Sequence, residues 1–209
     1  MITFTQLALF TAASLLLIFT PGPDIIYVMT RGIAQGRRSA LAAAVGFAVG
    51  NFAHTFFAIA GLSALLMSSA IAFQAVKYAG AAYLAYLGVR MIMSASALAP
   101  GTEAAPLRHW TIFRQSILAN VLNPKVAVFF LAFFPQFVDP AHGSVAVQML
   151  VLGTLFVLLT LLCFGIVGIC SGMLGRWLQR KPAIGGRLGQ AAGSILILLG
   201  LRLAWPEGK

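Results

Sequence analysis

The chain has 209 residues, of which 60% are hydrophobic and 9% are charged, and its mean hydropathy is +0.95. Soluble domains carry about 25% charged residues, so this composition excludes a soluble globular protein and indicates a single membrane domain. The net charge of +10 does not indicate a nucleic-acid partner, because no soluble scaffold displays a basic face and the positive-inside rule of membrane proteins explains the charge.

Six hydrophobic segments are long enough to cross a bilayer as helices. In chain order they run from residue 4 to 29, 39 to 67, 71 to 93, 112 to 134, 145 to 174 and 188 to 204. The sequence therefore predicts an all-α, polytopic membrane protein, with about six transmembrane helices in one transporter domain that covers residues 1–209.

The basic residues alternate along the loops of this predicted fold. The first, third and fifth loops are basic, whereas the second and fourth contain no Lys or Arg. Because cytoplasmic loops are enriched in Lys and Arg, we expect the odd-numbered loops to face the cytoplasm and both termini to lie on the opposite side. The basic residues are Arg31, Arg37, Arg38, Arg90, Arg108, Arg114, Arg176, Arg180, Lys181 and Arg187.

The first hydrophobic segment is interrupted at residues 20–24, which read TPGPD. Pro21 and Pro23 lack an amide hydrogen and clash with the preceding helical turn, and Gly22 lies between them. Asp24 follows at once, although a carboxylate at the bilayer centre costs about 2.5–3.5 kcal/mol. A broken helix with a charge is tolerated at membrane depth only inside protein or beside a wet cavity. The run predicts a transport site; alternatively, Asp24 only caps the second half-helix.

A second break is predicted in the fourth segment, where Asn123 and Pro124 precede Lys125. A cation at a helix N-terminus is unfavourable because of the helix dipole, so Lys125 needs an anionic partner, unless its side chain extends to the membrane interface instead. Asn120 and Asn123 flank this break. They would either complete the shell around a substrate or satisfy backbone groups that the break sets free.

The two halves of the sequence resemble each other. Residues 87–90 read LGVR near the end of the third segment, and residues 199–202 read LGLR near the end of the sixth. With three spans in each half, the repeats (1–94 and 111–209, joined by a cytoplasmic connection at 95–110) would be inverted, and their matching breaks would meet near the membrane midplane. Chance similarity between helices rich in Gly, Ala and Leu is the alternative.

Two further side chains are candidates for the transport path. His54 lies in the middle of the second segment, and the ordinary pKa of histidine near 6.5 suits proton coupling. Alternatively, a single histidine within a membrane helix is a hydrogen-bonded packing residue. Tyr83 lies between two glycines of the third segment and is expected either to line the cavity or to pack between helices.

Several motifs together resemble the LysE/RhtB family of amino-acid exporters. They are TPGPD at 20–24, Gly32 with the GRR of 36–38, Gly46 with Gly50 and His54, GAAYL at 80–84, NVLNPK at 120–125, FF at 129–130 and PQF at 135–137. The resemblance covers residues 4–137 by motif and the remainder by hydropathy and length. It implies a secondary transporter of the bacterial inner membrane that expels amino acids or close derivatives by proton antiport. The motifs are more similar to the homoserine/threonine and leucine branch than to the lysine branch.

The sequence thus predicts a transporter and not an enzyme, with neutral or hydroxylated amino acids and protons as its partners in the lipid bilayer, no cofactor and no resident metal; a homodimer is left open. The predicted substrate-binding residues are Asp24, Lys125, Asn120, Asn123, Pro21, Gly22, Pro23, Pro124 and Tyr83, and the predicted proton-coupling residues are Asp24 and His54.

Two other functions are alternatives to amino-acid export. A metal or inorganic-cation transporter of related architecture would need several carboxylates, thiolates or imidazoles in its site. A membrane thiol-disulfide relay would need a reactive cysteine pair, whereas Cys163 and Cys170 lie seven positions apart in an apolar stretch without a Cys-x-x-Cys motif.

Overall fold

The computed structural model describes residues 2–68, 70–93, 106–180 and 182–205, and all regular elements in these ranges are helical. The elements are α1 (Phe4–Phe19), α2 (Pro23–Gln35), α3 (Arg37–Ser68), α4 (Ala70–Met93), α5 (His109–Val121), α6 (Pro124–Val128), the π-helical turn η2 (Phe129–Phe133), the 3-10 turns η3 (Phe134–Phe137) and η4 (Pro140–His142), α7 (Val145–Arg180) and α8 (Pro182–Ala204). The predicted all-α class is confirmed. Most of the predicted connection at 95–110 lies outside the described residues.

Both predicted helix breaks are present. α1 and α2 are bent by 57° relative to each other, and the second bend, between α5 and the helical stretch that starts with α6, is 47°. Pro23 is the first residue of α2 and Pro124 the first residue of α6, the position at which a missing amide hydrogen costs nothing. The prolines therefore end one helix and start the next, as the sequence predicts.

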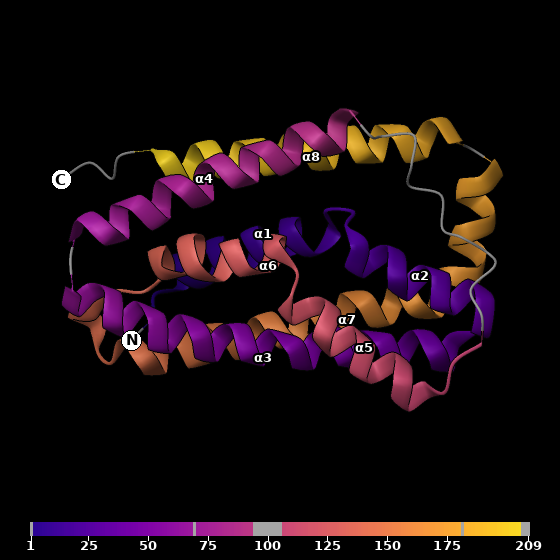
Figure 1. The fold of residues 1–209 in the computed structure, drawn as a ribbon, viewed down its shortest axis with the longest axis horizontal. Coiled ribbons are helices and arrows are strands. Elements are labelled where there is room, and N and C mark those ends of the chain that lie inside the picture. Colours follow the sequence, from indigo (N-terminus) through magenta and orange to yellow (C-terminus); the bar gives the residue numbers. More distant parts are fainter. Residues whose placement is uncertain (1, 69, 94–105, 181, 206–209) are drawn as a thin grey trace.

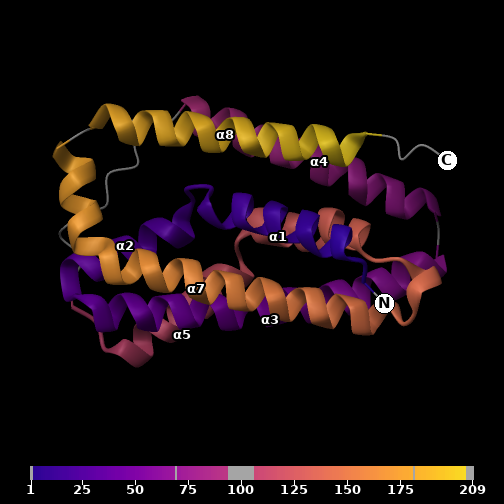
Figure 2. The ribbon, with the colours of Figure 1, turned by 180° about the vertical axis from the view of Figure 1, so that it is seen from behind.

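The segments run back and forth along the long axis of the molecule, and α1 begins near the end at which α8 finishes (Figures 1 and 2). α4 and α8 lie side by side in one layer, α3 packs against α5 and α7 in another, and α1 and α6 lie between these layers. α3 and α7 are long and apolar enough to cross a membrane alone, and each bent pair adds one candidate, so the described residues give two to four spans. Six spans stay a prediction, because that number also requires α4 and α8.

α4 and α8 touch through glycines at two places that mirror each other. A Cβ atom on Gly88 would lie 2.5 Å from the carbonyl oxygen of Gly193 and 3.0 Å from the backbone nitrogen of Ile197. A Cβ atom on Gly200 would lie 2.7 Å from the oxygen of Ala81 and 3.2 Å from the nitrogen of Ala85. The sequence shift that places Gly88 on Gly200 also places Ala81 on Gly193 and Ala85 on Ile197. This symmetry supports the prediction of two inverted repeats.

A second close contact between helices positions the polar centre of the molecule. A Cβ atom on Gly50 of α3 would lie 2.7 Å from Oδ1 of Asn120 on α5, and Gly46, one turn earlier, lies directly against the backbone oxygen of Phe113. Small residues allow helices in membranes to approach closely. The two glycines thereby bring α5 and the break after it against the middle of α3.

Candidate functional site

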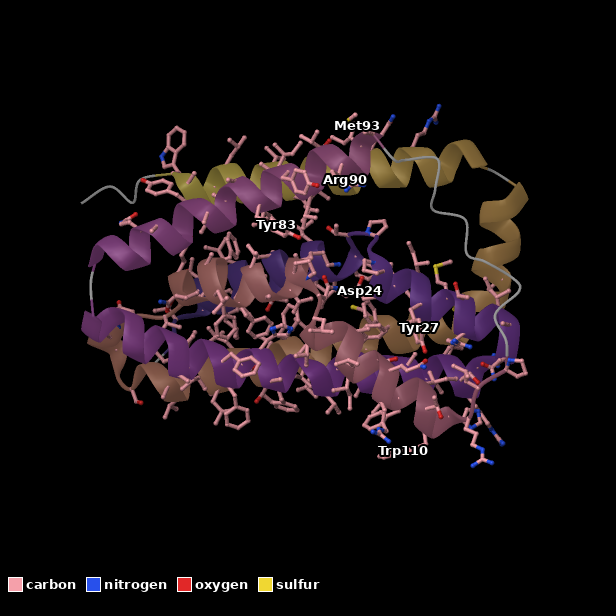
Figure 3. The ribbon with its side chains drawn as sticks, in the orientation of Figure 1. Asp24, Tyr27, Tyr83, Arg90, Met93 and Trp110 are labelled. Atoms are coloured by element: carbon pink, nitrogen blue, oxygen red, sulfur yellow. The ribbon has the colours of Figure 1, made fainter. Side chains whose placement is uncertain are left out.

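Asp24 and Lys125 form an ion pair where the two helix breaks meet. The Lys125 ammonium lies 3.1 Å from Oδ2 and 3.3 Å from Oδ1 of Asp24. The two residues are only 4% and 5% exposed, and Figure 3 shows Asp24 near the middle of the molecule, where the chain steps from α1 to α2. Because breaking a buried pair leaves a charge without a partner, each side chain depends on the other.

Lys125 is also held by the end of α1. Its ammonium donates hydrogen bonds to the backbone oxygens of Thr20 at 3.1 Å and Leu17 at 3.4 Å. The last carbonyls of a helix lack partners within the helix, and the negative end of the helix dipole favours a cation. Lys125 is the second residue of α6, where a cation is unfavourable, but its charge lies at the C-terminus of α1. The predicted need for an anionic partner is thus met by Asp24 and these carbonyls.

Asp24 does not act as a simple helix cap. Gly22 occupies the cap position of α2, and no side chain caps that helix. The carboxylate instead accepts from Lys125. Gly22 has an extended backbone (φ −150°, ψ 179°) that any residue can adopt, but a Cβ atom there would lie 2.7 Å from Oδ1 of Asp24 and 3.0 Å from Nζ of Lys125. A side chain at this position would therefore push the charged ends of the ion pair aside.

The two asparagines at the second break have different roles. Asn123 caps α6, since its side-chain oxygen accepts a hydrogen bond from the Lys125 amide at 3.0 Å. Its amide nitrogen Nδ2 is buried and bonds to no described residue. Asn120, which is 2% exposed, donates from Nδ2 to Oδ1 of Asn51 at 3.1 Å, and its own Oδ1 is buried without a partner among the described residues.

Asn51 extends this network to α7 by donating to the Thr160 hydroxyl at 3.0 Å. His54 joins it from the other side, because its Nε2 lies 3.0 Å from the backbone oxygen of Asn120. The His54 ring is 4% exposed and stacks on Phe130, with ring centroids 5.6 Å apart. One hydrogen-bonded network therefore connects the centre of α3 to α5 and α7.

A cavity of about 10 Å³ lies between the ion pair and this network. That is room for about one water molecule. Its polar lining residues come from five helices, α2, α3, α5, α6 and α7, and the others are apolar. The lining residues are Leu17, Ile18, Asp24, Asn51, Asn120, Lys125, Val126, Phe156, Thr160 and Phe164.

The structure brings together most of the predicted site. Asp24, Lys125 and Asn120 line the cavity, Pro21, Gly22, Pro23 and Pro124 form the two breaks, and Asn123 holds the start of α6. His54 and Tyr83 do not line it. His54 reaches the site only through the backbone of Asn120, and Tyr83 lies on α4 (Figure 3), where its ring is 6.0 Å from that of Tyr86.

Sequence reasoning missed two polar lining residues, Asn51 and Thr160. Asn51 carries a signal, because it is an amide within a hydrophobic segment, one helical turn before His54. No sequence signal distinguishes Thr160 from the other threonines in apolar helices. Their contact joins positions 109 residues apart, which no local pattern encodes.

The two alternative functions, a metal transporter and a thiol-disulfide relay, would need other side chains in the site. In the described part of the chain, no group of three or more His, Cys, Asp or Glu side chains is arranged to hold a metal ion. Cys163 is buried and Cys170 half-buried, and both are free thiols. Neither lines the cavity.

Comparison with known proteins assigns the family. The family model described as LysE type translocator matches residues 15–206. The chain belongs to the LysE family of translocators. The LysE assignment covers the regions of both helix breaks and extends through α8, beyond the motifs that carried the resemblance. No solved structure matches the chain.

Curated relatives of this LysE-type translocator carry names that differ in detail. The homoserine/homoserine lactone efflux protein of Salmonella typhi is 33% identical and aligns over 97% of each chain. The leucine efflux protein of an Enterobacter species is 29% identical over 84% of this chain and 83% of its own. An uncharacterized membrane protein of Vibrio cholerae is 34% identical over 88% of this chain and 89% of its own.

Proposed function

We propose that this translocator exports neutral amino acids or close derivatives across the bacterial inner membrane, in exchange for protons. The family assignment supports transport, and the names of the Salmonella and Enterobacter relatives support efflux of homoserine-like or leucine-like substrates. A metal ion as substrate is not favoured by any observation on the described residues.

The ion pair between Asp24 and Lys125 is the observation that carries this proposal. An α-amino acid is a zwitterion, so its binding site needs one group of each sign or equivalent dipoles. The two helix breaks supply one carboxylate and one ammonium 3.1 Å apart beside a polar cavity. In the bound state Asp24 receives the substrate ammonium and Lys125 the substrate carboxylate. In the empty carrier the two side chains neutralise each other.

Asparagine side chains and freed backbone groups complete this site. The Asn123 amide is a buried donor without a partner among the described residues, close to the Lys125 backbone to which the same side chain is bonded. A carboxylate held by Lys125 would satisfy such a donor. Because the cavity admits about one water, the ion pair has to separate and the broken helices have to move before an amino acid can enter.

Proton coupling follows from competition for one carboxylate. A proton on Asp24 removes the charge that attracts the substrate ammonium, so the proton and the substrate exclude each other from the site. When the carrier binds the substrate on one side of the membrane and the proton on the other, it exchanges the two across the membrane. His54, whose Nε2 bonds to the backbone oxygen of Asn120 beside this region, is the second proposed proton-coupling residue.

The proposal is tested in inverted membrane vesicles, into which an exporter pumps substrate. Vesicles that contain the full chain are made acidic inside, so that protons leave as substrate enters, and they receive labelled homoserine, threonine, leucine, lysine or glutamate. We expect accumulation of one or more of the three neutral amino acids, its collapse when an uncoupler is added, and no accumulation in vesicles without the protein. Accumulation of lysine or glutamate alone, or of none of the five, would refute it.

A further inference from the structure

Three buried side chains form a directed hydrogen-bond chain along one wall of the cavity. Asn120 donates to Asn51 at 3.1 Å, and Asn51 donates to the hydroxyl of Thr160 at 3.0 Å. Each of these residues is at most 2% exposed, and all three line the cavity together with the ion pair. The chain therefore crosses from α5 through α3 to α7 beside the proposed binding site.

The two ends of this chain have unused hydrogen-bonding capacity. Thr160 accepts from Asn51, but its hydroxyl hydrogen is donated to no described residue, whereas Thr55 and Thr154 each donate to the backbone oxygen four residues earlier. Oδ1 of Asn120 accepts from no described residue. Buried polar groups are normally paired. A donor and an acceptor are thus left open on one wall.

A hydroxyl group matches the chemistry of both ends, because it can donate one hydrogen bond and accept another. We propose that Thr160 and Asn120, held by Asn51, form a subsite that recognises a hydroxyl group on the side chain of the substrate. The inference rests on the proposed function and narrows its substrate class to neutral amino acids with a hydroxylated side chain.

The remaining lining residues agree with such a substrate. Asp24 and Lys125 are the charged residues of the lining, and both bind the ammonium and carboxylate groups of the amino acid. The lining therefore offers no partner to a charged substrate side chain. The carbon chain of the substrate would lie against Ile18, Phe156 and Phe164. A site built to hydrogen-bond a hydroxyl discriminates strongly against an analogue without one, because its own polar groups are left unpaired.

The test compares two substrates that differ in one group. Homoserine and norvaline have the same shape, except that a methyl group in norvaline replaces the hydroxyl. Initial rates of both are measured in inverted vesicles that contain the full chain, and the ratio of their kcat/KM values is the readout, so the amount of protein cancels. The variants are Thr160→Val, Thr160→Ala and Thr160→Ser. Thr154→Val is the matched control on the same helix, because Thr154 is exposed and bonds to the backbone oxygen of Leu150.

Thr160→Val and Thr160→Ala should lower the homoserine-to-norvaline ratio by about 3- to 10-fold, the value of one hydrogen bond. Thr160→Ser and Thr154→Val should leave the ratio at its original value. An unchanged ratio in both hydroxyl-free variants, or an equal loss of both substrates, would overturn the subsite and leave the proposed function standing. If the unaltered chain transports neither homoserine nor norvaline, this inference fails, whereas the proposed function fails only if threonine and leucine are not accumulated either.

Discussion

Asp24 and Lys125 show how two residues with matching local sequence acquire one joint role. Each follows a proline in the first turn of a helix. The helix dipole favours Asp24 there and disfavours Lys125, so the sequence alone predicts that Lys125 needs a partner. The contact with the end of α1 could not be foreseen, because it depends on how the two breaks are placed in space.

The first prediction concerns the stability of this pair. Lys125→Met or Asp24→Asn alone removes one partner of the pair. For a buried pair this typically lowers the free energy of unfolding by about 3–5 kcal/mol. The double variant leaves neither charge alone, so its loss should be smaller than the sum of the two single losses. Thermal unfolding of the protein in detergent measures this, with Arg114→Met, which removes an exposed cation from α5, as the control. Strictly additive losses would show that the two residues are not coupled.

The second prediction concerns Gly22. In Gly22→Ala the new methyl group would lie 2.7 Å from Oδ1 of Asp24 and 3.0 Å from Nζ of Lys125, while the backbone conformation suits alanine. We expect transport to fall by about tenfold or more, because displacements of the order of 1 Å in a site are costly, with the protein still folded in the membrane. Gly165→Ala is the control, since the nearest neighbour of its methyl group would be Leu41 at 4.0 Å. Equal transport by the two variants would contradict the close approach.

The breaks are predictable at the level of elements because proline and glycine act locally. The hydrogen-bond chain of Asn51, Asn120 and Thr160 is not predictable in this way. These residues come from three helices and meet only through the packing of α3 against α5 and α7. The π-helical turn η2 (Phe129–Phe133) also has no local signal in the sequence. It follows α6 directly and carries Phe130, on which His54 stacks.

The third prediction tests the contact between α4 and α8. Gly88→Ala would place a methyl group 2.5 Å from the backbone oxygen of Gly193, and backbone cannot move aside as a flexible side chain can. Overpacking of this kind costs about 1–3 kcal/mol, so the melting temperature should fall. Gly61→Ala serves as the control, because its methyl group would meet only Leu131 at 4.0 Å. A Gly88→Ala protein that melts with or above this control would argue against tight packing of these helices.

The molecule as a whole has the properties that its composition predicts, but the way its halves are arranged had to come from three-dimensional contacts. Hydropathy indicates the membrane and the family motifs indicate transport. The mirrored glycine contacts between α4 and α8 support the inverted repeats that the paired breaks suggest. The meeting of one anion and one cation from these breaks is the feature that follows least from composition and matters most for function.

The fourth prediction concerns the energy source. If one proton enters for each zwitterion that leaves, one net charge crosses the membrane per cycle. A potential of 100 mV then supplies about 2.3 kcal/mol, which sustains a gradient of about 40-fold at 1.4 kcal/mol per factor of ten. Depolarisation with valinomycin and high potassium should therefore weaken efflux even without a pH gradient. Efflux that does not respond to depolarisation would indicate an electroneutral exchanger or a facilitator.

The central claim is that the Asp24–Lys125 pair receives the substrate, and transport by single-charge variants tests it most directly. Accumulation of labelled homoserine and leucine is measured in inverted vesicles with the unaltered chain, Asp24→Asn, Lys125→Met and the control Arg114→Met, after the amount of each protein in the membrane has been matched. We predict transport by the unaltered chain and the control, and none by either variant of the pair. Transport close to the original rate by Asp24→Asn or Lys125→Met would contradict the account and make that residue structural.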